Sequence, residues 1–103
     1  MNDTYTIEIM PEASQAIRAR AVYIQEKGNP FAAANYANGV YAYINKYLTH
    51  NPELFRIQDY DTQIRLAFYK KTTAISYIVD KRNKRVTVLN VYHTHQDYAK
   101  QLN

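Results

Sequence analysis

The stretch that decides the fold runs from Gln63 to Tyr92 and reads "QIRLAFYKKTTAISYIVDKRNKRVTVLNVY". Three segments of it, residues 63–69, 73–79 and 85–92, are rich in β-branched and aromatic residues, a composition typical of strands. The polar connections between them, "KKT" and "DKRNK", are short. Because such short connections join neighbouring antiparallel strands, the sequence predicts a three-stranded antiparallel meander.

The residues before the meander predict one more strand and a helical hairpin. Apolar and polar residues alternate in "TYTIEIM", residues 4–10, as in a half-buried strand. Pro11 ends this strand and opens a helix over about residues 11–27, since proline is favoured in the first turn of a helix. A second apolar stripe with helical spacing runs from Ala33 to Leu48, which predicts a second, antiparallel helix.

Gly39 lies inside this second helix, where glycine costs about 1 kcal/mol relative to alanine. We therefore expect the two helices to approach each other closely at Gly39. Residues 50–62, "HNPELFRIQDYDT", are polar and rich in turn-forming residues, so a connection is expected there. The predicted class is α+β, with the order strand-helix-helix-strand-strand-strand, a helical hairpin on one face of a mainly antiparallel sheet, and a short C-terminal tail.

Length and composition favour a single folded domain spanning residues 1–103. The chain is 47% hydrophobic and 21% charged, which is typical of globular proteins. It has no cysteine, which excludes disulfides, thiolate zinc sites and thiol nucleophiles. No apolar run approaches the roughly 20 residues that span a bilayer, and no signal-type segment opens the sequence. A cytoplasmic protein without a membrane partner is therefore expected.

Positive charge gathers in the second half of the chain. Residues 1–55 carry four Lys or Arg against five Asp or Glu, whereas residues 56–103 carry nine against four. Such a half is suited to a polyanion or an acidic surface. The residues expected to contact a nucleic acid or another target are Arg65, Lys70, Lys71, Lys81, Arg82, Lys84 and Arg85.

The side to which Arg65 points depends on the alternation along residues 63–69. If the apolar set of Ile64, Leu66 and Phe68 meets the helices, Arg65 and Tyr69 lie on the open face of the sheet. On that face a guanidinium could contact a target.

The end of the sequence, "HTHQDY", holds the residues most suited to chemistry. No Gly-rich phosphate loop, Gly-x-Ser-x-Gly elbow or His-Glu-x-x-His helix occurs, which excludes large classes of enzyme. His93 and His95 would face opposite sides of a strand and have no third ligand at a defined spacing, so no metal and no other cofactor is expected.

Metal-free RNA cleavage fits these residue types better, because it needs a base, an acid and cations near the phosphate. The residues that could supply those roles are Arg65, Lys70, Lys71, His93, His95 and Tyr98. The alternative is that the histidines cap a strand end and that the lysines are exposed hairpin tips. Both interpretations stay open at this point.

The chain resembles the RelE/ParE superfamily of bacterial toxins from type II toxin-antitoxin modules. The resemblance rests on "YTIEIMPEASQAI", "NPFAAANYANGVYAYINKYLTHNPELF" and "IRLAFYKKTTAISYIVDKRNKRVTVLNVYHTHQD", with Arg65, Tyr77, His93 and Asp97 at the family's places. It implies a RelE/ParE-like fold and a toxin that inhibits growth. It also implies a cognate antitoxin that neutralises the toxin, a toxin-antitoxin hetero-oligomer, and contact with operator DNA only through the antitoxin.

Two branches of the family imply different targets. RelE-like members cut ribosome-bound mRNA with basic residues on the central strands; Arg65 matches one of these, but Ala74 stands where a second arginine is expected. ParE-like members inhibit DNA gyrase without being enzymes, and they share the histidine followed four places later by aspartate, here His93 and Asp97. The resemblance favours the ParE-like activity.

Two other functions remain as alternatives. One is a ribosome-dependent mRNA endoribonuclease, for which the catalytic residues would be Arg65, His93, His95 and Tyr98. The other is a non-toxic family member that serves as antitoxin ligand and co-repressor.

Overall fold

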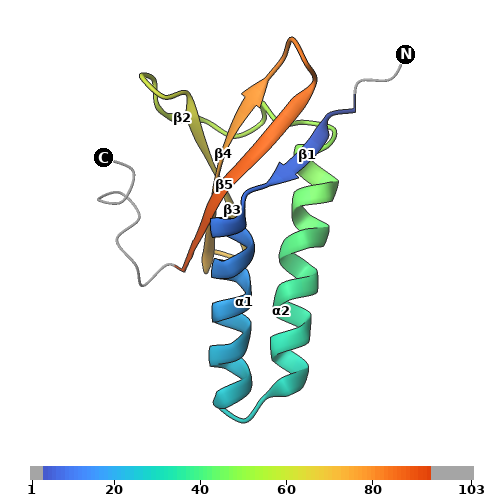
Figure 1. The fold of residues 1–103 in the computed structure, drawn as a ribbon, viewed down its shortest axis with the longest axis vertical. Helices are drawn as coiled ribbons and strands as arrows, with labels where there is room; N and C mark the ends of the chain where they lie inside the picture. Colours follow the sequence, from blue (N-terminus) through green and yellow to red (C-terminus); the bar gives the residue numbers. More distant parts are fainter. Residues whose placement is uncertain (1–3, 94–103) are drawn as a thin grey trace.

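Two helices cover one face of a five-stranded sheet in the computed structural model, which describes residues 4–93 (Figure 1). The strand order is β1-β5-β4-β3-β2; β1 runs parallel to β5, and the other neighbours are antiparallel. The elements are β1 (Thr6–Ile9), α1 (Pro11–Glu26), α2 (Pro30–Tyr43), a π-helical turn (Ile44–Leu48), β2 (Ile57–Asp59), β3 (Ile64–Tyr69), β4 (Thr73–Asp80) and β5 (Arg85–His93). This confirms the predicted α+β architecture.

Strand β2 was not predicted from the sequence. It is only three residues long, and its register with β3 shifts between Ile57 and Asp59, which pair with Arg65 and Ile64. So short an edge strand shows no alternation that a sequence pattern could detect. It forms because β3 offers an unpaired edge to the chain that returns from the helices.

Local signals define the turn of the helical hairpin, where α1 ends and α2 begins. Gly28 adopts a positive φ of 88° directly after α1, a conformation that glycine takes without strain at a helix C-terminus. The side chain of Asn29 then caps α2 by accepting a hydrogen bond of 3.0 Å from the Ala32 amide, and Pro30 follows at the first helical position. Among residues 4–93, no helix has both the length and the apolarity needed to cross a membrane.

The core lies between the helical hairpin and the sheet. Ile17, Val40, Ile44 and Leu48 come from the helices and are at most 1% exposed. Strands β4 and β5 supply the opposing side chains, which include Ile75, Tyr77, Val86 and Val88, all fully buried. Burial of this apolar surface is the main force that holds the hairpin on the sheet.

The expected orientation of β3 is wrong. Ala67 and Tyr69 belong to the core beneath the helices, whereas Leu66 joins a small cluster with Ala74 and Tyr92 on the other face. Arg65 therefore points to the helix side. This face accommodates its side chains individually: Ala67 is 1% exposed, the ring of Tyr69 fits against Gly39 of α2, and Arg65 bonds to backbone carbonyls.

Gly39 has a different neighbour from the one that the sequence suggested. A Cβ atom at this position would overlap the hydroxyl of Tyr69 and lie 2.9 Å from its Cζ atom. The close approach is thus between α2 and strand β3, not between the two helices. The Tyr69 ring projects from the sheet and fills the space that Gly39, which has no side chain, leaves open.

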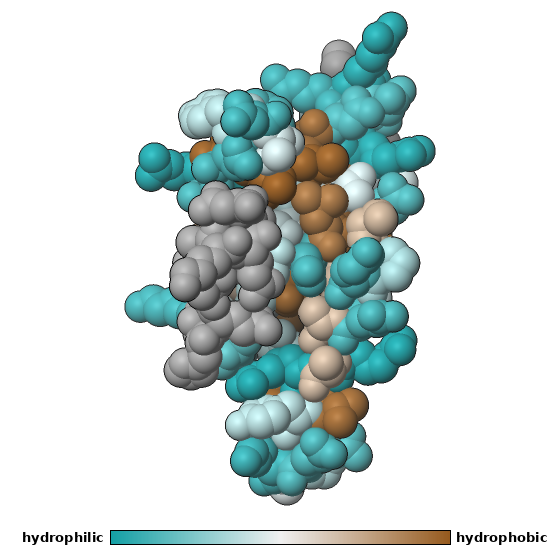
Figure 2. All heavy atoms as spheres, turned by 60° about the vertical axis from the view of Figure 1, so that its left-hand side comes forward, coloured by the Kyte–Doolittle hydropathy of each residue, from teal (hydrophilic) through white to brown (hydrophobic). Residues whose placement is uncertain are grey.

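The far end of the hairpin extends beyond the sheet (Figure 1). Large apolar side chains are exposed there, with Val22 at 47%, Tyr23 at 46% and Phe31 at 79%. Figure 2 shows apolar residues in a broken band that runs down the face in view and reaches toward the lower end of the molecule. Exposed apolar surface of this kind often marks a site of protein association.

Candidate functional site

The seven cations expected to contact a target are not gathered in one patch. Lys70 and Lys71 form the exposed turn between β3 and β4, and both have positive φ angles. The exposed cluster of Lys81, Arg82, Lys84 and Arg85 surrounds the turn between β4 and β5. These turns lie at opposite ends of the eight-residue strand β4, roughly 25 Å apart at about 3.3 Å per residue. Arg65 lies nearer the second turn, since it and Lys81 approach the same oxygen of Glu53.

Arg65 is held by the segment between the helices and β2. Its Nη1 atom donates hydrogen bonds to the carbonyl of Phe55 at 2.6 Å and to that of Glu53 at 3.2 Å. Its Nη2 atom lies 3.8 Å from Glu53 Oε2, and the side chain is only 15% exposed. The guanidinium therefore serves a structural role in joining this segment to the sheet.

Tyr77 fixes the same segment from the neighbouring strand. It is fully buried, pairs with Arg65 across the sheet, and donates a hydrogen bond of 2.6 Å to the carbonyl of Pro52. Burial raises the pKa of the Tyr77 phenol far above its ordinary value, although the nearby Arg65 charge opposes the rise. The phenol is thus a neutral donor, unsuited to proton exchange near neutral pH.

The structure does not bring Arg65 and His93 together. Arg65 pairs with Tyr77, and His93 pairs with Thr73 at the other end of β4. Four residues of strand and two strand spacings separate them, which amounts to roughly 16 Å between backbones. Because the carbonyls of Glu53 and Phe55 hold the guanidinium of Arg65, the two side chains do not converge on one site in this structure. The other two proposed catalytic residues, His95 and Tyr98, lie outside the described residues.

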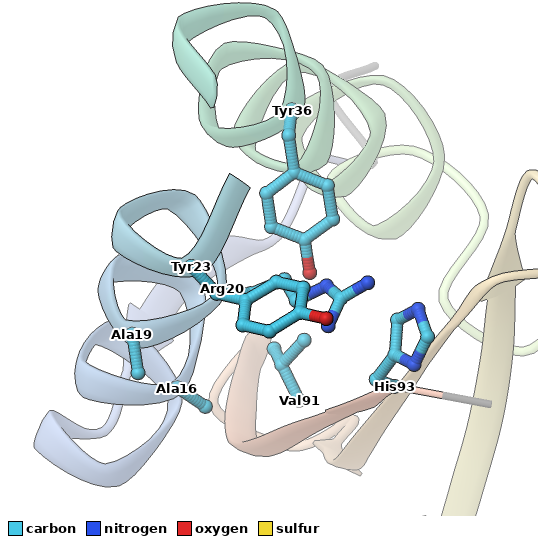
Figure 3. A pocket seen from close by; sticks show the side chains of 7 residues that line it. All are labelled: Ala16, Ala19, Arg20, Tyr23, Tyr36, Val91 and His93. Carbon is cyan, nitrogen blue, oxygen red and sulfur yellow. The ribbon is translucent and has the colours of Figure 1, made fainter. Parts of the chain in front are cut away.

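His93 lines a cavity of about 550 Å³ between α1, α2 and the end of β5. In Figure 3 the guanidinium of Arg20 points from α1 toward the imidazole, while the hydroxyl of Tyr36 reaches in from α2. The lining residues are Ala16, Ala19, Arg20, Tyr23, Tyr36, Val91 and His93. Polar groups from three elements thus converge on a partly apolar space, as in small-molecule sites.

The cavity is electropositive. Arg20 lies over the ring of Tyr23, with its Cζ atom 4.5 Å from the ring centre, and the Nζ atom of Lys27 lies 5.2 Å from the same centre. Within residues 4–93, none of the residues that line the cavity is acidic. Thr73, which pairs with His93, donates a hydrogen bond of 3.4 Å to the Tyr36 hydroxyl. Such a set of groups suits an anionic ligand.

Sequence reasoning found only His93 among these residues. Arg20, Tyr23 and Tyr36 lie on helices more than fifty residues before it, and no spacing rule connects them. The one available signal was the Arg20–Tyr23 pair, three places apart and therefore on one side of a helix. Among residues 4–93, no group of three or more potential ligands is arranged to hold a metal ion.

A second apolar depression lies on the other side of α2. Its volume is about 470 Å³, and it is lined by Gly39, Ala42, Tyr43, Lys46, Tyr47, Phe68 and Tyr69. The ring centres of Tyr43 and Tyr47 are 4.8 Å apart, and those of Tyr43 and Tyr69 are 5.4 Å apart. Phe68 remains 42% exposed. The rings pack on one another, which gives them a structural role without any ligand.

Solved structures of two toxin-antitoxin systems share this fold. A chain of the chromosomal ParDE TA system from P. aeruginosa is similar with a TM-score of 0.74 and 9% identity, covering 88% of this chain and 97% of that chain. A chain of the RelBE2 toxin-antitoxin complex from Mycobacterium tuberculosis has a TM-score of 0.56 and 18% identity, covering 87% and 98%. These similarities confirm the RelE/ParE-type fold. No family model and no curated protein matches the sequence.

Proposed function

We propose that this chain is the toxin of a type II toxin-antitoxin module and is neutralised by a cognate antitoxin. The similarity of its fold, over nearly the full length of both chains, to chains of the ParDE and RelBE2 systems supports this function. The antitoxin is expected to cover exposed apolar surface with an amphipathic segment. Val22, Tyr23 and Phe31 at the end of the helical hairpin offer such a surface.

Within this function we propose a ParE-like toxin that inhibits DNA gyrase by binding to it. The observation that supports this choice is the state of Arg65. Its Nη1 atom donates to two backbone carbonyls, and its strand position is far from that of His93. An mRNA endoribonuclease would need these groups around one phosphate, where electrostatic stabilisation is the largest catalytic contribution.

The second candidate function is RelE-like cleavage of ribosome-bound mRNA. The cavity beside His93 favours it, because an imidazole, a guanidinium and two phenols are the groups that general acid-base catalysis on RNA requires. In that case Arg20 would replace Arg65 as the cation near the phosphate.

Expression of the chain alone in a bacterial host tests the proposal. Growth should slow, and co-expression of the neighbouring gene product should restore it. Incorporation of labelled thymidine and methionine then separates the targets: inhibition of gyrase stops DNA synthesis first, whereas mRNA cleavage stops protein synthesis first. Normal growth with the intact, folded protein present would contradict the toxin function and leave the antitoxin ligand and co-repressor as the alternative.

A further inference from the structure

We propose that the cavity between α1, α2 and the end of β5 binds a phosphate monoester attached to a nucleoside. The ligand would be a free mononucleotide or the 5′-phosphorylated end of a single-stranded RNA. This inference goes beyond the proposed toxin function, which requires only an antitoxin and a protein target. It can be tested on the purified chain without any measurement of toxicity.

Arg20 is the first reason. Its guanidinium is partly buried, and no carboxylate among residues 4–93 pairs with it; its recorded contact is with the ring of Tyr23. A planar guanidinium that points into a cavity offers two parallel donors, which matches two oxygens of a phosphate. Stacking on Tyr23 also holds the guanidinium in place before any ligand binds, so less side-chain freedom is lost on binding.

The second reason is the number of donors around the cavity. The hydroxyls of Tyr23 and Tyr36 and the imidazole of His93 face the same space as Arg20 (Figure 3). A phosphate monoester has three terminal oxygens and accepts more hydrogen bonds than a carboxylate does. A single carboxylate from a peptide would engage fewer of these groups than a phosphate would, so the arrangement favours a phosphate.

Volume and aromatic surface extend the argument to the nucleoside. The cavity measures about 550 Å³, which is within the range of small-molecule sites and much larger than a phosphate group. Tyr23 is 46% exposed, and the small side chains of Ala16 and Ala19 keep the neighbouring part of the cavity wide. A base can stack on such a tyrosine ring, an interaction worth about 1 to 3 kcal/mol in single-strand binding proteins.

Other cations of the chain do not offer the same site. Arg65 already donates to two carbonyls, and Lys81 lies 3.0 Å from Glu53 Oε2. Lys70 and Lys71 stand on an exposed turn. None of these four cations combines the features of Arg20, which is partly buried, lies on an aromatic ring and lines a cavity together with further donors.

The test is titration of the folded full-length protein with AMP, followed by NMR chemical-shift changes and calorimetry. Arg20→Gln should weaken AMP binding by about tenfold or more, the effect of losing a charge-assisted hydrogen bond. Arg18→Gln is the matched control, because Arg18 is exposed on the same helix and does not line the cavity. The affinity of the Arg18→Gln variant for AMP should stay within about twofold of the wild-type value.

Further ligands identify which part is recognised. Adenosine and inorganic phosphate should each bind more weakly than AMP, and a 5′-phosphorylated tetraribonucleotide should bind more tightly than its 5′-hydroxyl form. If AMP binds more tightly than the phosphorylated tetraribonucleotide, the natural ligand is a free mononucleotide. If the tetraribonucleotide binds more tightly, the natural ligand is the 5′-phosphorylated end of an RNA. No binding of AMP at millimolar concentration, equal binding by Arg20→Gln, or Arg20-dependent binding of a glutamate-rich peptide in place of AMP would overturn the proposal.

Discussion

The two halves of strand β4, one near Tyr77 and the other near Thr73, lie beside similar residue types on the helix side, but their polar groups are used differently. Near Tyr77, the guanidinium of Arg65 and the tyrosine hydroxyl both donate to carbonyls of the segment before β2. Near Thr73, Arg20 rests on a tyrosine ring beside a cavity to which the described residues contribute no acidic side chain. The comparison teaches that an arginine whose donors are bonded within the described residues, as at Arg65, has a structural role, whereas Arg20 has no such bond among residues 4–93.

Arg65→Ala should give the largest loss of stability. The substitution removes two hydrogen bonds from a charged donor and leaves the carbonyls of Glu53 and Phe55 without it. A loss of about 3 kcal/mol in the free energy of unfolding is expected, measured by urea denaturation. Reduced toxicity of this variant should follow reduced amounts of folded protein. A variant as stable as the wild type would show that Arg65 is not a structural residue.

Tyr77→Phe should cost about 2 kcal/mol, because the carbonyl of buried Pro52 loses its donor in the core. Tyr36→Phe, on α2 beside Thr73 of β4, is the matched change. Its hydroxyl has a long 3.4 Å contact with Thr73, so its loss should cost less than 1 kcal/mol. Equal losses for the two variants would remove the contrast between the ends.

Alkaline conditions should reveal the same contrast through Tyr77. Burial raises the pKa of this phenol in the folded state above its ordinary value of 10.0. Below pH 10 the phenol is protonated in both states, so its contribution is fully present. As the pH rises above 10, the unfolded chain ionises first, and stability falls by up to about 1.4 kcal/mol per pH unit.

Tyr77→Phe should lack this part of the decrease. The measurement is denaturant unfolding of the wild type and the variant at pH 9 and pH 11. If the wild type and the variant lose the same free energy of unfolding between pH 9 and pH 11, the group that titrates is not Tyr77.

Glu53→Gln should have a small effect, about 0 to 1 kcal/mol. Its carboxylate lies 3.0 Å from Lys81 Nζ and 3.8 Å from Arg65 Nη2, but the Glu53 side chain is 44% exposed and that of Lys81 is 68% exposed. Solvent screens such pairs, and the carbonyl bonds of Arg65 remain. Thermal unfolding at low and high salt should show a difference only at low salt.

Arg20→Gln should have the smallest effect on stability, below about 0.5 kcal/mol. It removes a cation-π contact with a half-exposed ring and no hydrogen bond that the structure records for Arg20. Chemical denaturation measures this directly. A loss as large as that of Arg65→Ala would mean that the cavity end is as fully bonded as the other end.

Much of the fold follows from the sequence, because the signals are local. The β-branched and aromatic runs within residues 63–92 predicted β3, β4 and β5, and "KGNP" marks the end of one helix and the start of the next. Strand β2 and the partner of Gly39 were missed. Each depends on a segment distant in the chain: β2 needs the edge of β3, and Gly39 needs the ring of Tyr69.

The candidate site divides in the same way. The sequence by itself determined the strands, the helical hairpin and the presence of histidine at the end of β5, because each follows from patterns within a few residues. Only the tertiary structure decided that Arg65 turns toward carbonyls and that Arg20 and Tyr36 meet His93. The physical reason is that alternation distinguishes two faces of a strand without saying which one the helices cover. The fit of Tyr69 against Gly39 and the carbonyl bonds of Arg65 go with the face that the helices cover.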